Sequence, residues 1–323
     1  IRVTSPASAA VARKLCAVTV DLDEIPSYLG IHGLEEVAGL ARGAVYGEAI
    51  GRLGTFAEGL GAPMTWFVVG HELGRPGVVE QLKGCLARGD EIASHTLDHR
   101  YDLLRLSAEQ RQRQVFEGKE RLVSALGVEP KGFRAPGYLV DDALLELVSR
   151  AGHQWDSSVF PCPAYWAAKV AVMGGQRLAK RSSRAIVGSP TALMAPRTPY
   201  RIGAHYWRRG RGLLEIPVQV TPGLRMPFIG TSLGVGGPAV ARRLARSLAS
   251  ESTVNLELHG LDALDRFDGL EPLAAVQPDL RVPWSRKLAS IGAALWTLKD
   301  AGFEFVTLSE LAAQFPPAPA ADS

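Results

Sequence analysis

Short apolar runs along the chain alternate with longer amphipathic stretches. Runs such as "KLCAVTVDLD" (14–23) are rich in β-branched residues and predict buried strands. The stretches between them place apolar residues at helical spacing, and one of them opens on Ser107 as an N-cap and ends at a glycine. The pattern predicts strands at 14–23, 62–70, 90–95, 212–220, 252–260 and 303–308, and helices at 45–60, 76–89, 107–127, 141–151, 238–250, 282–302 and 309–315.

This rhythm is lost over residues 161–212, which are rich in Pro, Gly, Arg and Ser and show no clear period. Elsewhere the alternation of strand and helix predicts a parallel sheet, either doubly wound or closed into a barrel. We expect one α/β domain over residues 1–315, with an irregular insertion at about 161–235, and a disordered tail at 316–323. In both architectures functional groups gather at the carboxyl ends of the strands.

The composition is that of a globular protein, with 46% hydrophobic and 21% charged residues. The net charge of +3 gives no indication of nucleic-acid binding, and the basic runs at 180–184 and 208–212 are more typical of solvated loops than of anion sites. The three cysteines, Cys16, Cys85 and Cys162, form no CxxC pair and predict no disulfide framework.

The longest apolar runs are far shorter than the roughly 20 residues that a transmembrane helix needs. The first residues lack the apolar core of a signal peptide. The sequence does not begin with Met, so whether a segment precedes it is left open. A cytoplasmic location is therefore the expectation, and peripheral association with a membrane stays open.

Two acidic residues end the first predicted strand. Asp21 and Asp23 are two residues apart, so their carboxylates project from the same face of the strand. Side by side in an apolar core they would repel each other and lose hydration, and a bound cation would resolve that conflict. The alternative is a strand end that already opens into solvent, where the two acids only cap a turn.

Two histidines follow the third predicted strand in "EIASHTLDHR" (91–100). His95 and His99 alone could be a partly exposed, hydrogen-bonded pair. With one carboxylate they make the three-ligand environment that holds a divalent ion and leaves a position for water, whose pKa the ion lowers toward neutrality. A second carboxylate could then accept the proton of that water. Arg134, Asp156 and His259 are also taken to follow strand ends. His259 does so in "STVNLELHG", and Arg134 and Asp156 do so in the short segments "KGFRAP" (131–136) and "HQWDSS" (153–158) that flank the helix at 141–151.

The segments "TVDLDE", "SHTLDH", "FRAPGY" and "LELHG", in this order, resemble the polysaccharide deacetylase family, carbohydrate esterase family four, with its NodB-homology domain. The "VDLD" form resembles the branch with peptidoglycan deacetylase-like and cyclic-amidase-like members. The resemblance covers residues 16–160 and 252–312. It implies a distorted (β/α) barrel of the NodB type whose open mouth holds one divalent ion.

The resemblance also implies roles for individual residues. Asp23, His95 and His99 would be the metal ligands and Asp21 the general base. Arg134 of "RAP" would orient Asp21 and form an ion pair with it. The implied metal is zinc, with Co, Ni, Mn and Fe as alternatives.

Four further residues acquire roles in the same way. The backbone N–H of Gly137 or Tyr138 would help to hold the oxyanion. His259 would be the general acid for the leaving amine, with Asp156 as the partner that raises its pKa. The family's Asp/Trp motif is blurred in this chain, because "WDSSVFPCPAYW" (155–166) supplies Asp156 while the next tryptophan lies far downstream.

The expected reaction is hydrolysis of an N-acetyl or N-formyl amide on an amino sugar or glycan. Residues 161–235 are long, basic and partly apolar, which favours a small or lipid-linked glycan carrying phosphate. The alternatives are a cyclic-amide hydrolase similar to allantoinase and a glycan-binding module without activity. A non-haem iron oxygenase would share the ligand set, but those enzymes use all-β scaffolds.

Overall fold

The computed structural model describes residues 13–34, 39–178 and 186–316. The first twelve residues, the basic run at 180–184 and nearly all of the predicted tail lie outside these ranges. Within them, no helix has the length and apolar character that crossing a bilayer requires.

Most of the predicted strands and helices are present, within a few residues of the predicted ends. The strands are β1 (Lys14–Asp21), β2 (Met64–Val68), β3 (Glu91–Ser94), β4 (Gly132–Phe133), β5 (Trp155–Asp156), β6 (Tyr200–Ile202), β7 (Arg209–Glu215), β8 (Thr253–His259) and β9 (Phe303–Val306). The helices are α1 (Ile25–His32), α2 (Ile50–Leu60), α3 (Val78–Ala87), α4 (Ala108–Leu126), α5 (Asp142–Arg150), α6 (Pro163–Leu178), α7 (Gly230–Ser247), α8 (Trp284–Asp300) and α9 (Leu308–Ala312).

The strands form one sheet in the order β6-β7-β5-β4-β3-β2-β1-β8. Every pair is parallel except β6 with β7. On one side β1 pairs with β8, and on the other its first half pairs with β9 and its second half with β2. β1 is buried along almost its whole length because it lies at the centre of this arrangement.

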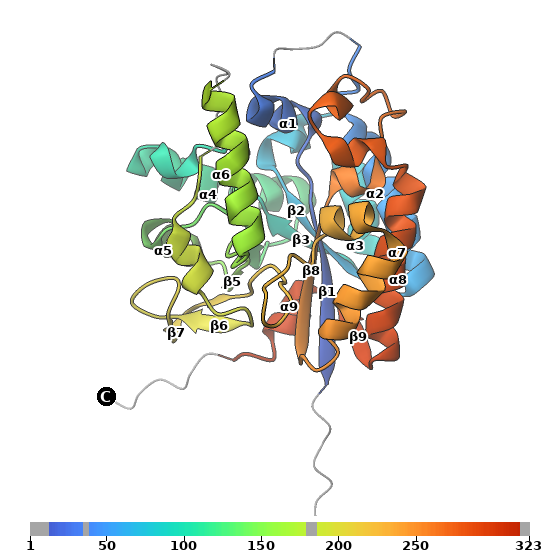
Figure 1. Cartoon of the computed structure of the whole chain (residues 1–323). Helices are drawn as coiled ribbons and strands as arrows, with labels where there is room; N and C mark the ends of the chain where they lie inside the picture. The colour runs from blue at the N-terminus through green and yellow to red at the C-terminus, as the bar shows by residue number, and fades with distance from the viewer. Residues whose placement is uncertain (1–12, 35–38, 179–185, 317–323) are drawn as a thin grey trace, which may run out of the picture.

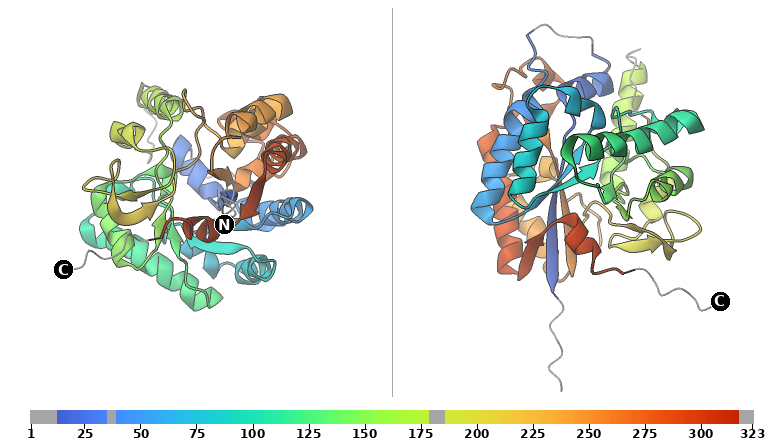
Figure 2. Two further views of the ribbon diagram at one scale, coloured as in Figure 1. Left: turned by 90° about the horizontal axis from the view of Figure 1, so that it is seen from below. Right: turned by 180° about the vertical axis from the view of Figure 1, so that it is seen from behind.

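The sheet curls, and an irregular segment joins its two ends. The segment after β7 reaches β8 through the Gln219 N–H, which donates to the Asn255 carbonyl at 3.1 Å. The Asn255 side chain donates in turn to the carbonyls of Ile216 and Pro217. Viewed from below, the helices surround the strands (Figure 2). The predicted distorted (β/α) barrel is confirmed, with this segment in place of a regular closing strand.

The prediction of an irregular stretch at 161–212 is wrong for α6, which stands at the front of the molecule (Figure 1). Its sequence is rich in good helix formers, but Val170 and Val172 are exposed. A helix that turns apolar residues toward solvent lacks the amphipathic period on which the prediction depended. α1 was also missed, and α7 begins eight residues before the predicted start because it continues through a break at Gly237.

The three cysteines are all buried and free. Ser107 caps α4 as predicted, since its side chain accepts from the Gln110 N–H.

α4 packs closely against the loop that carries both histidines. At Gly118 of α4, an added Cβ would lie 2.8 Å from the Thr96 carbonyl carbon and 2.9 Å from the Leu97 nitrogen. Both are backbone atoms and cannot rotate away. Only glycine therefore permits this approach of helix and loop.

We expect Gly118→Ala to lower the free energy of unfolding by about 1–3 kcal/mol, the usual cost of overpacking. Gly84→Ala is the matched control, because Gly84 lies in α3 with no atom within 4 Å of the added Cβ. It should raise stability by about 0.5–1 kcal/mol through helix propensity alone. Urea unfolding of the two variants measures the difference, and equal effects would contradict the close-packing argument.

Candidate metal centre and active site

Asp23, His95 and His99 converge at the carboxyl ends of β1 and β3. The Asp23 Oδ1 atom lies 3.2 Å from His95 Nε2 and 2.9 Å from His99 Nε2. All three residues are buried, and they form a group that could hold a metal ion, with one potential ligand atom from each within 4.8 Å of the others. The tertiary structure thus brings together the three predicted ligands.

The facing atoms of Asp23, His95 and His99 are free to bind a cation. Asp23 Oδ1 and both Nε2 atoms are buried without a hydrogen bond of acceptable geometry. The His95 Nδ1 lies 2.7 Å from the Arg134 carbonyl oxygen, which can only accept, so Nδ1 carries the proton and Nε2 presents its lone pair. Two imidazoles and one carboxylate are the donor set of open zinc-type sites. A divalent ion would satisfy all three atoms at once.

Charge also favours this arrangement. Burial raises the pKa of the Asp23 carboxyl, but the electrostatic interactions with the nearby His99 and His95 rings outweigh it and hold the pKa well below its usual range. Asp23 is therefore a carboxylate, the form that binds a metal.

The loop between the two histidines has an uncommon backbone conformation, which hydrogen bonds within the loop and with α4 hold in place. Thr96 and His99 both have positive φ, of 67° and 51°, which is uncommon for residues other than glycine. The Thr96 hydroxyl accepts from the His99 N–H at 3.1 Å. Asp98 and Gln114 of α4 exchange two hydrogen bonds. The surrounding contacts thus hold a conformation that aims His99 at Asp23.

Asp21 accepts a hydrogen bond from Arg134, which is completely buried. Asp21 therefore differs from the three candidate ligands, because one of its oxygens already has a partner. The Arg134 Nη1 donates to Asp21 Oδ1 at 2.7 Å and to the Thr19 hydroxyl at 3.1 Å. Its Nε and Nη2 donate to the carbonyl and hydroxyl of Ser157, and the guanidinium lies over the Phe67 ring, 4.0 Å from its centroid. The second Asp21 oxygen, Oδ2, lies 3.9 Å from His95 Nε2 and so faces the candidate metal position.

The partner of His259 differs from the predicted one. Glu257 Oε1 lies 2.7 Å from His259 Nδ1, and His259 Nε2 lies 3.9 Å from Asp23 Oδ2. Asp156 instead accepts from the N–H and the hydroxyl of Ser158. The expected pairing of Asp156 with His259 is therefore corrected to Glu257. The sequence held a signal for it, because Glu257 and His259 are two residues apart on one strand, like Asp21 and Asp23.

Glu257 changes the acidity of the ring. Burial lowers the pKa of His259, but the charge and hydrogen bond of Glu257, with the charges of Asp23 and Asp21, outweigh it and raise the pKa well above its usual value. Because Nδ1 is turned to a carboxylate, the other ring nitrogen is the one that can face a substrate.

The turn of Gly137 and Tyr138 lies beside these groups, with φ of 61° and 58°. The Tyr138 N–H already donates to the Ala135 carbonyl at 3.2 Å. Gly137 is therefore the better of the two predicted oxyanion donors.

A second group of potential ligands consists of Asp21, Glu257 and His259. Its atoms are already engaged, since Asp21 pairs with Arg134 and Glu257 contacts His259 Nδ1. In the group of Asp23, His95 and His99 the carboxylate has no described arginine or lysine as a partner, and one atom of each residue faces a common position without a hydrogen bond, so this group is the better metal site.

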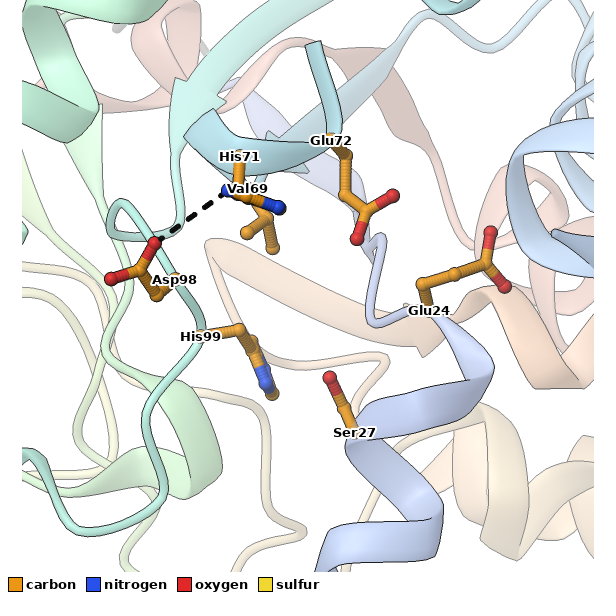
Figure 3. Close-up of a pocket in the computed structure, with 7 residues that line it drawn as sticks. All are labelled: Glu24, Ser27, Val69, His71, Glu72, Asp98 and His99. Carbon is orange, nitrogen blue, oxygen red and sulfur yellow. Dashed lines mark ion pairs between the residues drawn. The ribbon is translucent and has the colours of Figure 1, made fainter. Parts of the chain in front are cut away.

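A small cavity of about 200 Å³ borders His99, lined by residues of α1, the turn after β2 and the histidine loop (Figure 3). His71 at its edge has a side chain that is 78% exposed and lies 3.9 Å from Asp98. Two of the acids lining this cavity, Glu24 and Glu72, are paired with Arg75. The cavity therefore offers no second metal site of comparable quality.

Comparison with known proteins agrees with this geometry. Residues 53–155 match the sequence model of the polysaccharide deacetylase family. The chain is similar to a peptidoglycan deacetylase of Helicobacter pylori, with 29% identity over 147 residues, 45% of this chain and 49% of that protein. It is also similar to a peptidoglycan-N-acetylglucosamine deacetylase of Bacillus cereus, with 33% identity over 94 residues, 29% of this chain and 42% of that protein. The matches thus span about half the length of these relatives or less.

Among solved structures, a putative polysaccharide deacetylase from Mycobacterium smegmatis superposes with a TM-score of 0.57 at 17% identity, over 99% of this chain and 98% of that one. At this identity the likeness shows a shared fold. The chain is therefore similar to the polysaccharide deacetylases over part of its sequence and has the NodB-type fold that the order of its motifs predicted.

Proposed function

We propose that this chain is a metal-dependent hydrolase that removes an N-acetyl or N-formyl group from an amino sugar or glycan. The observation that carries the proposal is the buried, unpaired group Asp23, His95 and His99 beside two oriented pairs, Asp21 with Arg134 and His259 with Glu257. The names of the similar proteins, which are peptidoglycan deacetylases, support the same reaction and substrate class.

The three ligands and Asp21 would serve the attack on the amide. A divalent ion bound by Asp23, His95 and His99 would polarise the acyl carbonyl and lower the pKa of a water molecule. Asp21 would accept a proton from the attacking water through Oδ2, because Oδ1 is bound to Arg134. The Gly137 N–H would donate to the oxygen that becomes negative when the carbon–oxygen bond forms.

His259 would complete the reaction on the other side of the carbon. Its Nε2 would donate a proton to the amide nitrogen as the carbon–nitrogen bond breaks, so that a neutral amine and a carboxylic acid form, and the acid then loses its proton to solvent. Glu257 would act as a positioning residue that holds the Nδ1 proton and stabilises the imidazolium. The pair of Asp21 and Arg134 would thus accept one proton, and the pair of His259 and Glu257 would supply one.

Metal analysis of the purified protein, combined with acetate and formate release across a panel of N-acylated sugars, tests the proposal. We expect about one equivalent of a divalent metal, zinc first, and release that a chelator abolishes and added metal restores. Release that persists at full rate in metal-free protein would contradict the proposed chemistry.

We expect His259→Ala to lower amide turnover by about 10²–10⁴-fold, the range for loss of a general acid. An activated ester should be nearly spared, because its leaving group needs no proton. The ratio of amide to ester turnover is the measurement. Equal loss on both substrates would assign His259 to the wall of the acyl pocket instead.

We expect Glu257→Gln to move the alkaline limb of kcat/KM to lower pH. The reaction needs protonated His259, so activity falls as pH rises through the pKa of this residue. The Glu257 charge raises that pKa, and the neutral amide removes the increase. A limb that stays in place would show that Glu257 does not set the protonation of His259.

A further inference from the structure

A cavity of about 520 Å³ opens over the candidate site, and Asp23 and His259 are among the residues that line it. Its other lining residues come from α1, Tyr101, the turn of Gly137 and Tyr138, α6, the start of α7 and residues 276–279. This volume is typical of pockets that enclose most of a small ligand. A cavity of this size has room for a compact molecule or for the end of a chain.

Much of the lining is apolar and reaches the surface. Leu261 and Ile229 are buried at the inner part, while Val172 of α6 and Val235 of α7 are 51% and 56% exposed. Single exposed valines are normal, but these two line the same cavity as the buried residues. An apolar surface thus continues outward between α6 and α7.

The lining also contains polar and charged residues, among them Lys169. The Lys169 Nζ donates to the Gly137 carbonyl at 3.0 Å and lies 5.8 Å from the centroid of the Tyr165 ring. Within the described residues no carboxylate forms an ion pair with it, and burial lowers the pKa of its ammonium group to about 8. Because an ammonium group has three hydrogens, two remain for a ligand. Lys169 is also the one Lys or Arg among the described residues that line this cavity.

We propose that the cavity binds an N-acylated amino sugar that carries a phosphate, paired with Lys169, and an apolar chain, placed between α6 and α7. A lone ammonium acts on phosphate as a point charge, whereas planar recognition of a carboxylate is the role of arginine. The inference rests on the proposed function for the amide group and adds the chemistry of the rest of the substrate.

Four probes separate charge from apolar chain: N-acetylglucosamine, its 1-phosphate, its octyl glycoside and the octyl ester of its 1-phosphate. Binding is measured by calorimetry on chelator-treated protein, so that no turnover is involved. We expect the phosphate to tighten binding by about 10-fold or more, as for a charge-assisted hydrogen bond. The octyl chain should also tighten it by about 10-fold or more through burial of several methylenes.

Variants then assign each effect to its residue. Lys169→Gln keeps a donor for the Gly137 carbonyl but removes the charge, so the preference for phosphate should fall by about 10-fold or more. Lys83→Gln, on the exposed surface of α3, should keep the preference. Val172→Asn should reduce the octyl effect severalfold, whereas Val123→Asn, at a valine of α4 that is 41% exposed, should not.

The outcomes distinguish this inference from the proposed function. If the phosphate and octyl effects appear but the metal-loaded protein releases no acetate, the binding inference holds and the proposed reaction fails. If all four probes are hydrolysed with equal kcat/KM, the reaction stands and the inference is overturned. Absence of binding at millimolar concentrations, or a preference for phosphate that survives Lys169→Gln, also overturns it.

Discussion

His99→Ala is expected to abolish both metal binding and activity while leaving the fold intact. The His99 Nε2 atom and the facing atoms of Asp23 and His95 are all buried without a hydrogen-bond partner, and His99 lies in a loop beyond the end of β3. Loss of one ligand of three should reduce metal content well below one equivalent. Turnover should fall by more than about 10³-fold, because a bound ion contributes several kcal/mol to the transition state.

Elemental analysis, turnover and thermal unfolding of His99→Ala measure these effects together. A structural zinc site would behave differently, because the protein would unfold when a ligand is lost. His71→Ala is the matched control, since His71 is exposed at the edge of the neighbouring cavity. It should keep its metal and its activity. A His99→Ala protein with a full equivalent of metal would refute the ligand assignment.

Asp21→Asn and Asp23→Asn are expected to fail in different ways. Asp21→Asn should keep the metal and lose turnover by about 10²–10⁴-fold, the contribution of a general base. The amide oxygen can still accept from Arg134 in place of Oδ1, so the local geometry should survive. Asp23→Asn should weaken metal binding first, because its Oδ1 faces both imidazoles.

Metal titration of the two variants, followed by turnover at saturating metal, separates the roles. Asp23→Asn should recover activity in part as metal is added, and Asp21→Asn should not. If both proteins bind metal as tightly as the wild type, the assignment of Asp23 as the metal ligand and Asp21 as the general base is wrong.

The local sequence pattern was sufficient to predict which residues lie at the ends of strands and which of them share a face. Asp21 and Asp23 share a face because side chains alternate along a strand, and parallel strands end at one edge of the sheet. These two regularities bring the acids and the histidines to the same edge of the sheet. Such relations follow from the geometry of the elements themselves and need no knowledge of side-chain packing. The resemblance to the polysaccharide deacetylases supplied the choice of Asp23 as the ligand and the pairing of Asp21 with Arg134, and the fold brings both sets of residues together.

The sequence by itself thus indicated a parallel sheet and the strand ends that carry the candidate site, but β4, β5 and β6 are only two or three residues long and were not predicted as strands. Only the tertiary structure decided the partner of His259, because Asp156 lies on β5 and β5 is separated from β8 by four strands along the sheet. It alone showed that the Tyr138 N–H is already engaged within its turn. It also revealed α6 and the position of Lys169 over the site. α6 escaped prediction because its exposed valines line a cavity instead of a core, so burial imposed no period on its sequence.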